Sequence, residues 1–131
     1  MNEIIEKIKS AIKELEKENS PLLLYALFLR NDSLERWDII VAASWLSSSE
    51  MQSYKTVSEK LRQWLSESEL VQFSRVVILD QDDPVVSFLL DLEVLKNGGY
   101  KELSAETLSE KFGFTIKKAY LLRSQKLNMK R

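Results

Sequence analysis

Three short, nearly continuous apolar runs constrain the fold of this chain more than any other feature of its sequence. They are "PLLLYALFLR" (residues 21–30), "WDIIVAAS" (37–44) and "RVVIL" (75–79). Apolar runs of this length are typical of buried strands, and the second run is also rich in β-branched residues. We therefore predict three buried strands, which must belong to a common sheet.

Segments with helical periodicity lie before, between and after these runs. The first helix should end before Ser20–Pro21, because the residue that precedes a proline avoids the α region. Apolar residues three and four positions apart mark the buried face of each helix. The three stripes are Ile4, Ile5, Ile8, Ala11, Ile12 and Leu15; Met51, Tyr54, Val57, Leu61, Trp64 and Leu65; and Val85, Phe88, Leu89, Leu92 and Leu95.

The second helix is preceded by residues with the spacing of a capping box. Ser47 with Glu50, and Ser49 with Gln52, both fit this pattern, in which a hydroxyl and a carboxylate or amide three positions later exchange hydrogen bonds with the backbone. Both pairs remain candidates for the helix start.

The connections between the runs predict how the strands pair. The loop between 21–30 and 37–44 is short, so these strands should form an antiparallel hairpin. A helix separates 37–44 from 75–79, which predicts a right-handed parallel crossover.

The segment "LSEKFGFTIKKAYLLRS" (108–124) supports two interpretations. In one, Ser104 caps a helix, Gly113 makes a turn, and a second helix follows to complete a helix-turn-helix. In the other, the same short helix is followed by a last strand that covers an open sheet edge. We favour the strand, because a helix-turn-helix needs a third supporting helix and the sheet has already used the others.

These expectations define an α/β fold at the border with α+β. The sheet should be small and mixed, with three to four strands and flanking helices in the order α-β-β-α-β-α-(short α)-β. A helix-turn-helix in place of the last strand is the alternative. The chain of 131 residues suits a single domain, residues 1–131, with 125–131 as a flexible basic tail.

The composition excludes several kinds of chemistry. There is no cysteine and no histidine, so disulfides, thiolate metal sites and Ser–His or Cys–His catalysis are ruled out within this chain. None of the three glycines lies in a phosphate-binding loop. No segment has the apolar character of a signal peptide or a membrane span. We therefore expect a cytoplasmic protein that is not an enzyme and has no membrane association.

Charge is distributed unevenly along the chain. Residues 1–110 carry 12 basic and 20 acidic residues, a net charge of −8, whereas residues 111–131 carry seven basic residues and no acid. Such asymmetry is typical of a surface for nucleic acid or another anion, or of a basic end that packs against its own acidic body. The candidate contacts are Lys111, Lys117, Lys118, Arg123 and Lys126.

Polar residues gather at the predicted carboxyl ends of two strands, where ligands bind to parallel crossovers. Carboxylates at this edge could hold Mg²⁺, which prefers oxygen ligands, although capping and turn formation account for the same residues without a ligand. We favour capping, by Asp82 or Asp83 before Pro84, and predict no cofactor, with Mg²⁺ as the exception to be tested. The candidate residues are Asp80, Asp82, Asp83, Ser44 and Trp45, with Ser47–Ser49 nearby.

Asp38 interrupts an otherwise apolar strand. It either faces water at the edge of that strand, or is buried and paired, with Arg30 or Arg36 as the nearest cations in sequence.

Three functional hypotheses follow. The first is a non-enzymatic protein-interaction or assembly module that forms a homodimer, because an open sheet should retain an apolar patch. The second is a nucleic-acid-binding protein that uses residues 111–131. The third is a Mg²⁺-dependent phosphoryl-transfer or nuclease-like enzyme at the Asp80–Asp83 edge.

Overall fold

The helices and strands follow the predicted chain order, with two short additions. The computed structural model describes residues 2–30, 36–92, 94–95, 99–113 and 115–126. Its elements are α1 (Asn2–Glu18), β1 (Leu24–Arg30), β2 (Trp37–Ala42), α2 (Met51–Trp64), α3 (Glu67–Leu70), β3 (Phe73–Ile78), α4 (Pro84–Leu92), β4 (Lys101–Glu102), α5 (Ala105–Phe112) and β5 (Ile116–Ser124).

The strands form one mixed sheet in the order β3-β2-β1-β5-β4. The predicted antiparallel hairpin of β1 and β2 and the predicted parallel pairing of β2 with β3 are both confirmed. The expected three to four strands is a small undercount, because β4 was not foreseen. Its two residues, Lys101 and Glu102, are both exposed and charged, so no apolar pattern marks them as a strand.

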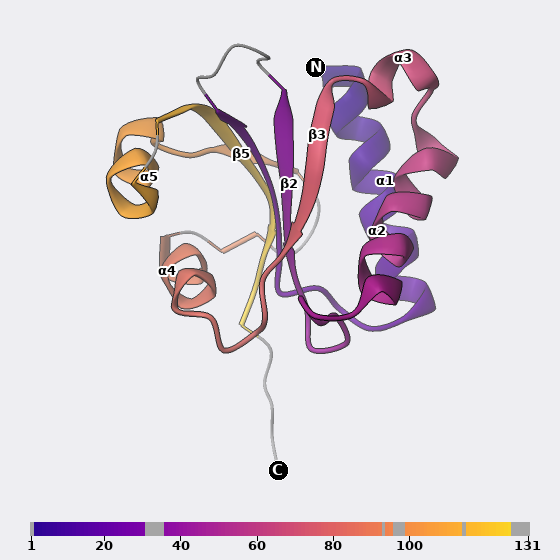
Figure 1. Cartoon of the computed structure of the whole chain (residues 1–131), viewed down its shortest axis with the longest axis horizontal. Coiled ribbons are helices and arrows are strands. Elements are labelled where there is room, and N and C mark those ends of the chain that lie inside the picture. The colour runs from indigo at the N-terminus through magenta and orange to yellow at the C-terminus, as the bar shows by residue number, and fades with distance from the viewer. Residues whose placement is uncertain (1, 31–35, 93, 96–98, 114, 127–131) are drawn as a thin grey trace.

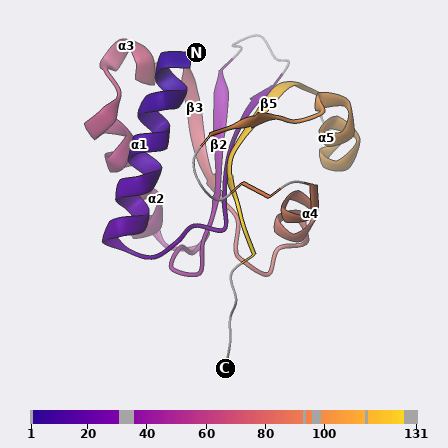
Figure 2. The same cartoon turned by 180° about the vertical axis from the view of Figure 1, so that it is seen from behind.

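Helices cover both faces of this sheet. Helices α1, α2 and α3 lie on one side, and α4 and α5 lie on the other, as Figures 1 and 2 show from opposite directions. Each face has its own cluster of buried apolar side chains. This arrangement explains the continuous apolar runs, since a strand that is covered on both faces needs apolar residues at successive positions.

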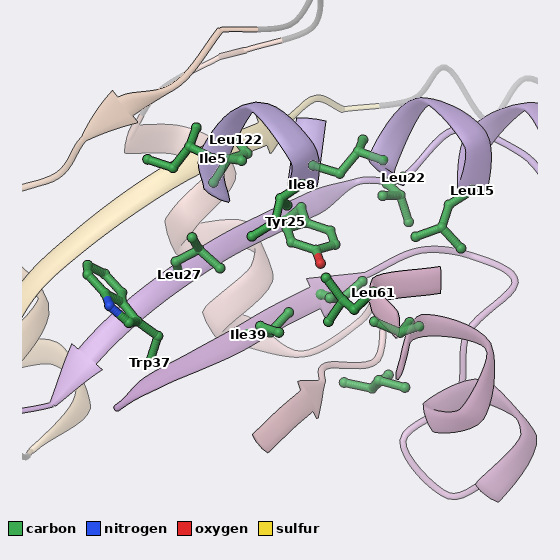
Figure 3. Close-up of a cluster of buried hydrophobic side chains, with 14 of the residues drawn as sticks. Ile5, Ile8, Leu15, Leu22, Tyr25, Leu27, Trp37, Ile39, Leu61 and Leu122 are labelled. Carbon is green, nitrogen blue, oxygen red and sulfur yellow. The ribbon is translucent and has the colours of Figure 1, made fainter. Parts of the chain in front are cut away.

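The larger cluster joins α1 and α2 to the sheet (Figure 3). The α1 stripe is buried as predicted, from Ile4 to Leu15. At the margin of this cluster, the Lys60 ammonium of α2 lies 3.1 Å from Glu14 Oε1 and 2.9 Å from Glu18 Oε1 of α1. Hydrogen bonds from Glu18 and Glu14 raise the Lys60 pKa, so the cation is retained at a buried position between the two helices.

The helix starts only partly match the predicted caps. For α2 both capping-box candidates are wrong: Glu50 is the N-cap and its side chain makes no capping bond. The Ser47 backbone N–H instead donates to Ser53 Oγ at 3.0 Å, so the loop is closed by a residue inside the helix. A complete capping box occurs at Ser66 and Glu69, before α3, where none was predicted.

The segment after Ser104 resolves the question of the last element in favour of a strand. Ser104 caps α5 as predicted, and Gly113 ends it in the left-handed conformation with φ of 77°. Residues 116–124 are then extended and pair with β1, so the second helix of the helix-turn-helix alternative is wrong. The physical reason is tertiary: β5 fills the position between β1 and β4, where Ala119 and Leu121 are fully buried.

The end of the chain is only partly described. Of the predicted basic tail, Gln125 and Lys126 are described, and 127–131 lie outside the described residues, as do residues 96–98 of the predicted helix stop. The Gln125 side chain donates to the Leu22 carbonyl at 2.8 Å, which holds the start of this segment on the sheet. No helix in the described ranges is both long and apolar enough to span a bilayer.

Candidate functional site

Asp80, the first residue of the predicted ligand edge, joins two loops. Its carboxylate accepts hydrogen bonds from the Ser48 backbone N–H at 2.9 Å and from the Ser48 hydroxyl at 2.6 Å. The bond from the hydroxyl, followed by that from the N–H, lowers the Asp80 pKa. The segment after β3 is thus tied to the loop that precedes α2, which is a structural use of the carboxylate.

The other residues of that edge are dispersed in their roles. Asp83 accepts the Val85 backbone N–H at 2.9 Å and caps α4, as predicted, while Asp82 is exposed. Trp45 donates its indole N–H to the Ser20 carbonyl at 2.9 Å, and Ser44 is exposed. Over the ranges that the structure describes, no three acidic side chains converge on a metal-binding position.

Two of the five candidate nucleic-acid contacts pair with acids of the same chain. The Arg123 guanidinium, only 5% exposed, lies 2.9 Å from Glu16 Oε1, and Lys126 lies 2.6 Å from Asp91 Oδ1. These two pairs match the expectation that the basic end packs against the acidic body.

The other three candidates are exposed, on α5 and β5. Lys111 lies over the Phe88 ring at 4.9 Å, and Lys118 over the Tyr120 ring at 5.9 Å. Lys117 precedes Lys118 on β5. The candidates thus divide into a buried pair member, a surface pair member and three exposed cations.

Asp38 is buried rather than water-facing. Its side chain is 3% exposed, and its Oδ2 atom lies 3.1 Å from Arg30 Nε and 3.4 Å from Arg75 Nη2. The prediction of a partner at Arg30 is therefore confirmed, and Arg75 was missed. The parallel register of β2 and β3 sets Asp38 beside Arg75, a long-range pairing that no sequence spacing could reveal.

The other oxygen of this carboxylate has no partner. Asp38 Oδ1 is buried and accepts no hydrogen bond. Buried polar atoms are nearly always paired, and the exceptions call for an explanation. An unsatisfied acceptor on a buried strand is a candidate contact for a ligand.

Strand β3, which carries Arg75, forms one edge of the sheet. It pairs with β2 on one side, and no described strand pairs with its other side (Figure 1). The Leu79 N–H donates to Val41 of β2, so by the alternation of backbone groups those of Val76 and Ile78 should point away from the sheet. The stretch Val76–Ile78 is apolar and follows the register shift near Arg75, so an uncharged, regular edge is left open.

A cavity lies against each face of this edge strand. The one on the α2 and α3 side has a volume of about 240 Å³, and the one on the α4 and α5 side about 210 Å³. The first is lined by Ile39, Ser58, Leu61, Arg62, Leu70, Phe73, Ser74, Arg75 and Val76; the second by Phe28, Asp38, Ile40, Arg75, Val77, Leu79, Val85 and Phe112. Side chains of an added strand point alternately to the two faces, so each cavity lies where such side chains would project.

The opposite edge of the sheet differs in every respect that matters for pairing. Strand β4 has only two residues, and both are charged and exposed. Short, charged edges are a usual way to prevent strand addition. The edge at β3 is therefore the one at which another strand could be added.

Comparison with known proteins supplies no relative from which a function could be transferred: no protein-family model, no curated protein and no solved structure matches this chain. The open β3 edge, its two flanking cavities and the unsatisfied Asp38 oxygen are thus the features from which function is inferred. Sequence reasoning missed all three, although the apolar run 75–79 did identify the strand itself.

Proposed function

We propose that this protein is a non-enzymatic assembly module that forms a homodimer by pairing the β3 strands of two copies. One observation carries the proposal: β3 presents an apolar, regular edge, Val76–Ile78, to which no described strand is paired. Addition of a strand to such an edge supplies main-chain hydrogen bonds, and cavities for alternate side chains supply specificity.

The charges near β3 favour a second copy as the partner, in antiparallel orientation. Arg75 stands near the beginning of the strand, and Asp80, Asp82 and Asp83 follow its end. When two identical strands pair antiparallel, the beginning of each lies beside the end of the other. Arg75 of one copy would then approach the acidic segment of the other, twice in each dimer.

The geometry of the acids supports assembly over catalysis as the role of this region. Asp80 and Asp83 accept bonds from Ser48 and Val85 that organise loops around β3. They therefore give the ends of the edge strand a defined shape. The nucleic-acid hypothesis, the Mg²⁺ hypothesis and the cytoplasmic location remain predictions.

The test removes the outward backbone donor of β3. Val76→Pro deletes an N–H that points away from β2, and proline is tolerated on edge strands where that group faces solvent. We expect the parent protein to sediment as a dimer at micromolar concentration. The variant should sediment as a monomer, with the circular dichroism of the parent.

A matched control exists on the other edge. The Leu103 N–H donates to Ala119 of β5, so the N–H of Glu102 should point outward from β4. Glu102→Pro therefore removes an equivalent donor at the edge to which no function is assigned, and should remain dimeric. A parent protein that is monomeric at tens of micromolar, or a Val76→Pro variant that stays as dimeric as the parent, would contradict the proposal.

A further inference from the structure

We propose that the cavity between α4, α5 and the sheet binds a small neutral molecule with an aromatic body and one hydroxyl group, which donates a hydrogen bond to Asp38 Oδ1. The cavity is lined by residues of a single chain, from β1, β2, β3, α4 and the last residue of α5. The inference therefore does not depend on the proposed dimer.

The walls of the cavity select an apolar body. Apart from Asp38 and Arg75, all of its lining residues are aromatic or aliphatic. Phe28 and Phe112 meet edge to face with centroids 5.5 Å apart, which leaves ring surfaces available to a ligand ring. An apolar cavity of about 150 Å³ holds benzene, and the volume here, about 210 Å³, admits a ring with small substituents.

The polar contact selects a hydrogen-bond donor. Asp38 is buried, lines this cavity and has one carboxylate oxygen without a partner. A hydroxyl group can donate to that oxygen, and a purely apolar ligand would leave it unsatisfied. Because sites with a buried acceptor discriminate against ligands that lack the matching donor, the hydroxyl should decide affinity.

The surrounding charges exclude an ionic ligand. Arg30 and Arg75 already place two cations on the Asp38 carboxylate. An ammonium group would be a third cation beside one anion, and a carboxylate ligand would oppose Asp38 itself. A neutral donor avoids both repulsions.

Four probes of similar size test these three arguments on the full chain. We expect 4-methylphenol to bind with a Kd of about 1 mM or tighter, given the contribution expected per atom of so small a ligand. Toluene, which lacks only the hydroxyl, should bind at least about tenfold more weakly. Benzylammonium and benzoate should also bind more weakly than 4-methylphenol. Chemical-shift titration by NMR measures each affinity and reports whether Phe28 and Val77 signals move.

Two variants locate the site. Val77→Phe fills the cavity without altering Asp38, and should abolish binding of 4-methylphenol. Val71→Phe adds the same ring at a position that is 62% exposed and outside the cavity, and should bind as the parent does. Asp38→Leu, if it folds, should bind toluene and 4-methylphenol with equal affinity.

Three results would overturn the inference: equal affinity of the parent for toluene and 4-methylphenol, binding that survives Val77→Phe, or tighter binding of either charged probe. The same titration on Val76→Pro separates this proposal from the dimer. Binding in a parent protein that proves monomeric would leave the ligand site standing and remove only the assembly proposal.

Discussion

The Arg123 guanidinium on the last strand lies 2.9 Å from the carboxylate of Glu16 on the first helix, and both side chains are largely buried. A residue from the basic end of the chain thus neutralises one from the acidic body, 107 positions away. Glu16 Oε2 also accepts the Leu22 backbone N–H at 2.8 Å, so a single carboxylate joins α1, the start of the sheet and β5.

Removal of Glu16 should therefore destabilise the fold. Breaking a buried ion pair typically costs about 3–5 kcal/mol, because one charge is left uncompensated. Glu16 retains 18% exposure, so we expect Glu16→Ala to lower the free energy of unfolding by about 2–3 kcal/mol. Urea unfolding measures this change. In a double-mutant cycle, Arg123→Met should recover part of the loss; strictly additive effects would show that the pair is not coupled.

Tyr25 should gain from the loss of its hydroxyl. Its side chain is fully buried among apolar residues (Figure 3), its hydroxyl has no hydrogen-bond partner, and burial raises its pKa above the usual range. A buried polar group without a partner costs about 1–3 kcal/mol. We therefore expect Tyr25→Phe to raise the free energy of unfolding by about 1 kcal/mol.

Tyr54 provides the matched control for that prediction. Its hydroxyl donates to the Ser48 carbonyl at 2.9 Å, so Tyr54→Phe removes a bond that is made. We expect a loss of about 0.5–1.5 kcal/mol, opposite in sign to the effect at Tyr25. Thermal or urea unfolding of both variants is sufficient, and a destabilised Tyr25→Phe protein would refute the prediction.

Stability should fall in acid because three carboxylates have lowered pKa values. The causes are hydrogen bonds from Lys7 to Glu69, from Trp64 and Lys60 to Glu14, and from Ser48 to Asp80. A lowered pKa in the folded state stabilises the fold above the unfolded-state value, and this stabilisation is lost as pH falls through the folded-state value.

The usual values of these groups, 4.5 for Glu and 3.8 for Asp, place the loss below about pH 4.5. We expect unfolding midpoints in urea to decrease from pH 5 to pH 3, and to decrease less in Glu69→Gln. Equal decreases in the two proteins would show that the Lys7–Glu69 pair does not contribute.

Magnesium binding distinguishes the capping role of Asp80 from a metal site. If Asp80, Asp82 and Asp83 only organise loops, Asp80→Ala should bind no less Mg²⁺ than the parent, and it should unfold more readily because Ser48 loses both of its bonds to the carboxylate. Calorimetry measures the first property and urea unfolding the second. A micromolar Mg²⁺ affinity that disappears in the variant would restore the enzymatic hypothesis.

Nucleic-acid binding should be weak at most. Arg123 and Lys126 pair with Glu16 and Asp91, which leaves Lys117 and Lys118 as the adjacent exposed cations on β5. If these two contact phosphates, Lys117→Ala with Lys118→Ala should flatten the log–log dependence of affinity on salt by about two units. Anisotropy titrations with duplex DNA and single-stranded RNA at low salt test this, and we expect no binding of nanomolar affinity by the parent.

Much of the fold was determined by the sequence alone. Apolar runs identified β1, β2 and β3, helical stripes identified α1, α2 and α4, and chain connectivity predicted how the first three strands pair. These features are local or depend on short connections, so a single chain segment carries enough information. The start of α5 at Ser104 and its end at Gly113 are likewise local, since a hydroxyl cap and a left-handed glycine act within one turn.

The tertiary structure decided the rest, because it depends on residues that are distant in the chain. Residues 116–124 have the character of a strand only because β1 and β4 lie on either side of them. Asp38 acquires Arg75 through the register of two strands, and the cavity beside that pair exists only when α4 and α5 cover the same face of the sheet. A sequence displays which side chains are apolar or charged; which of them meet is set by long-range packing, and both proposed sites arise from such meetings.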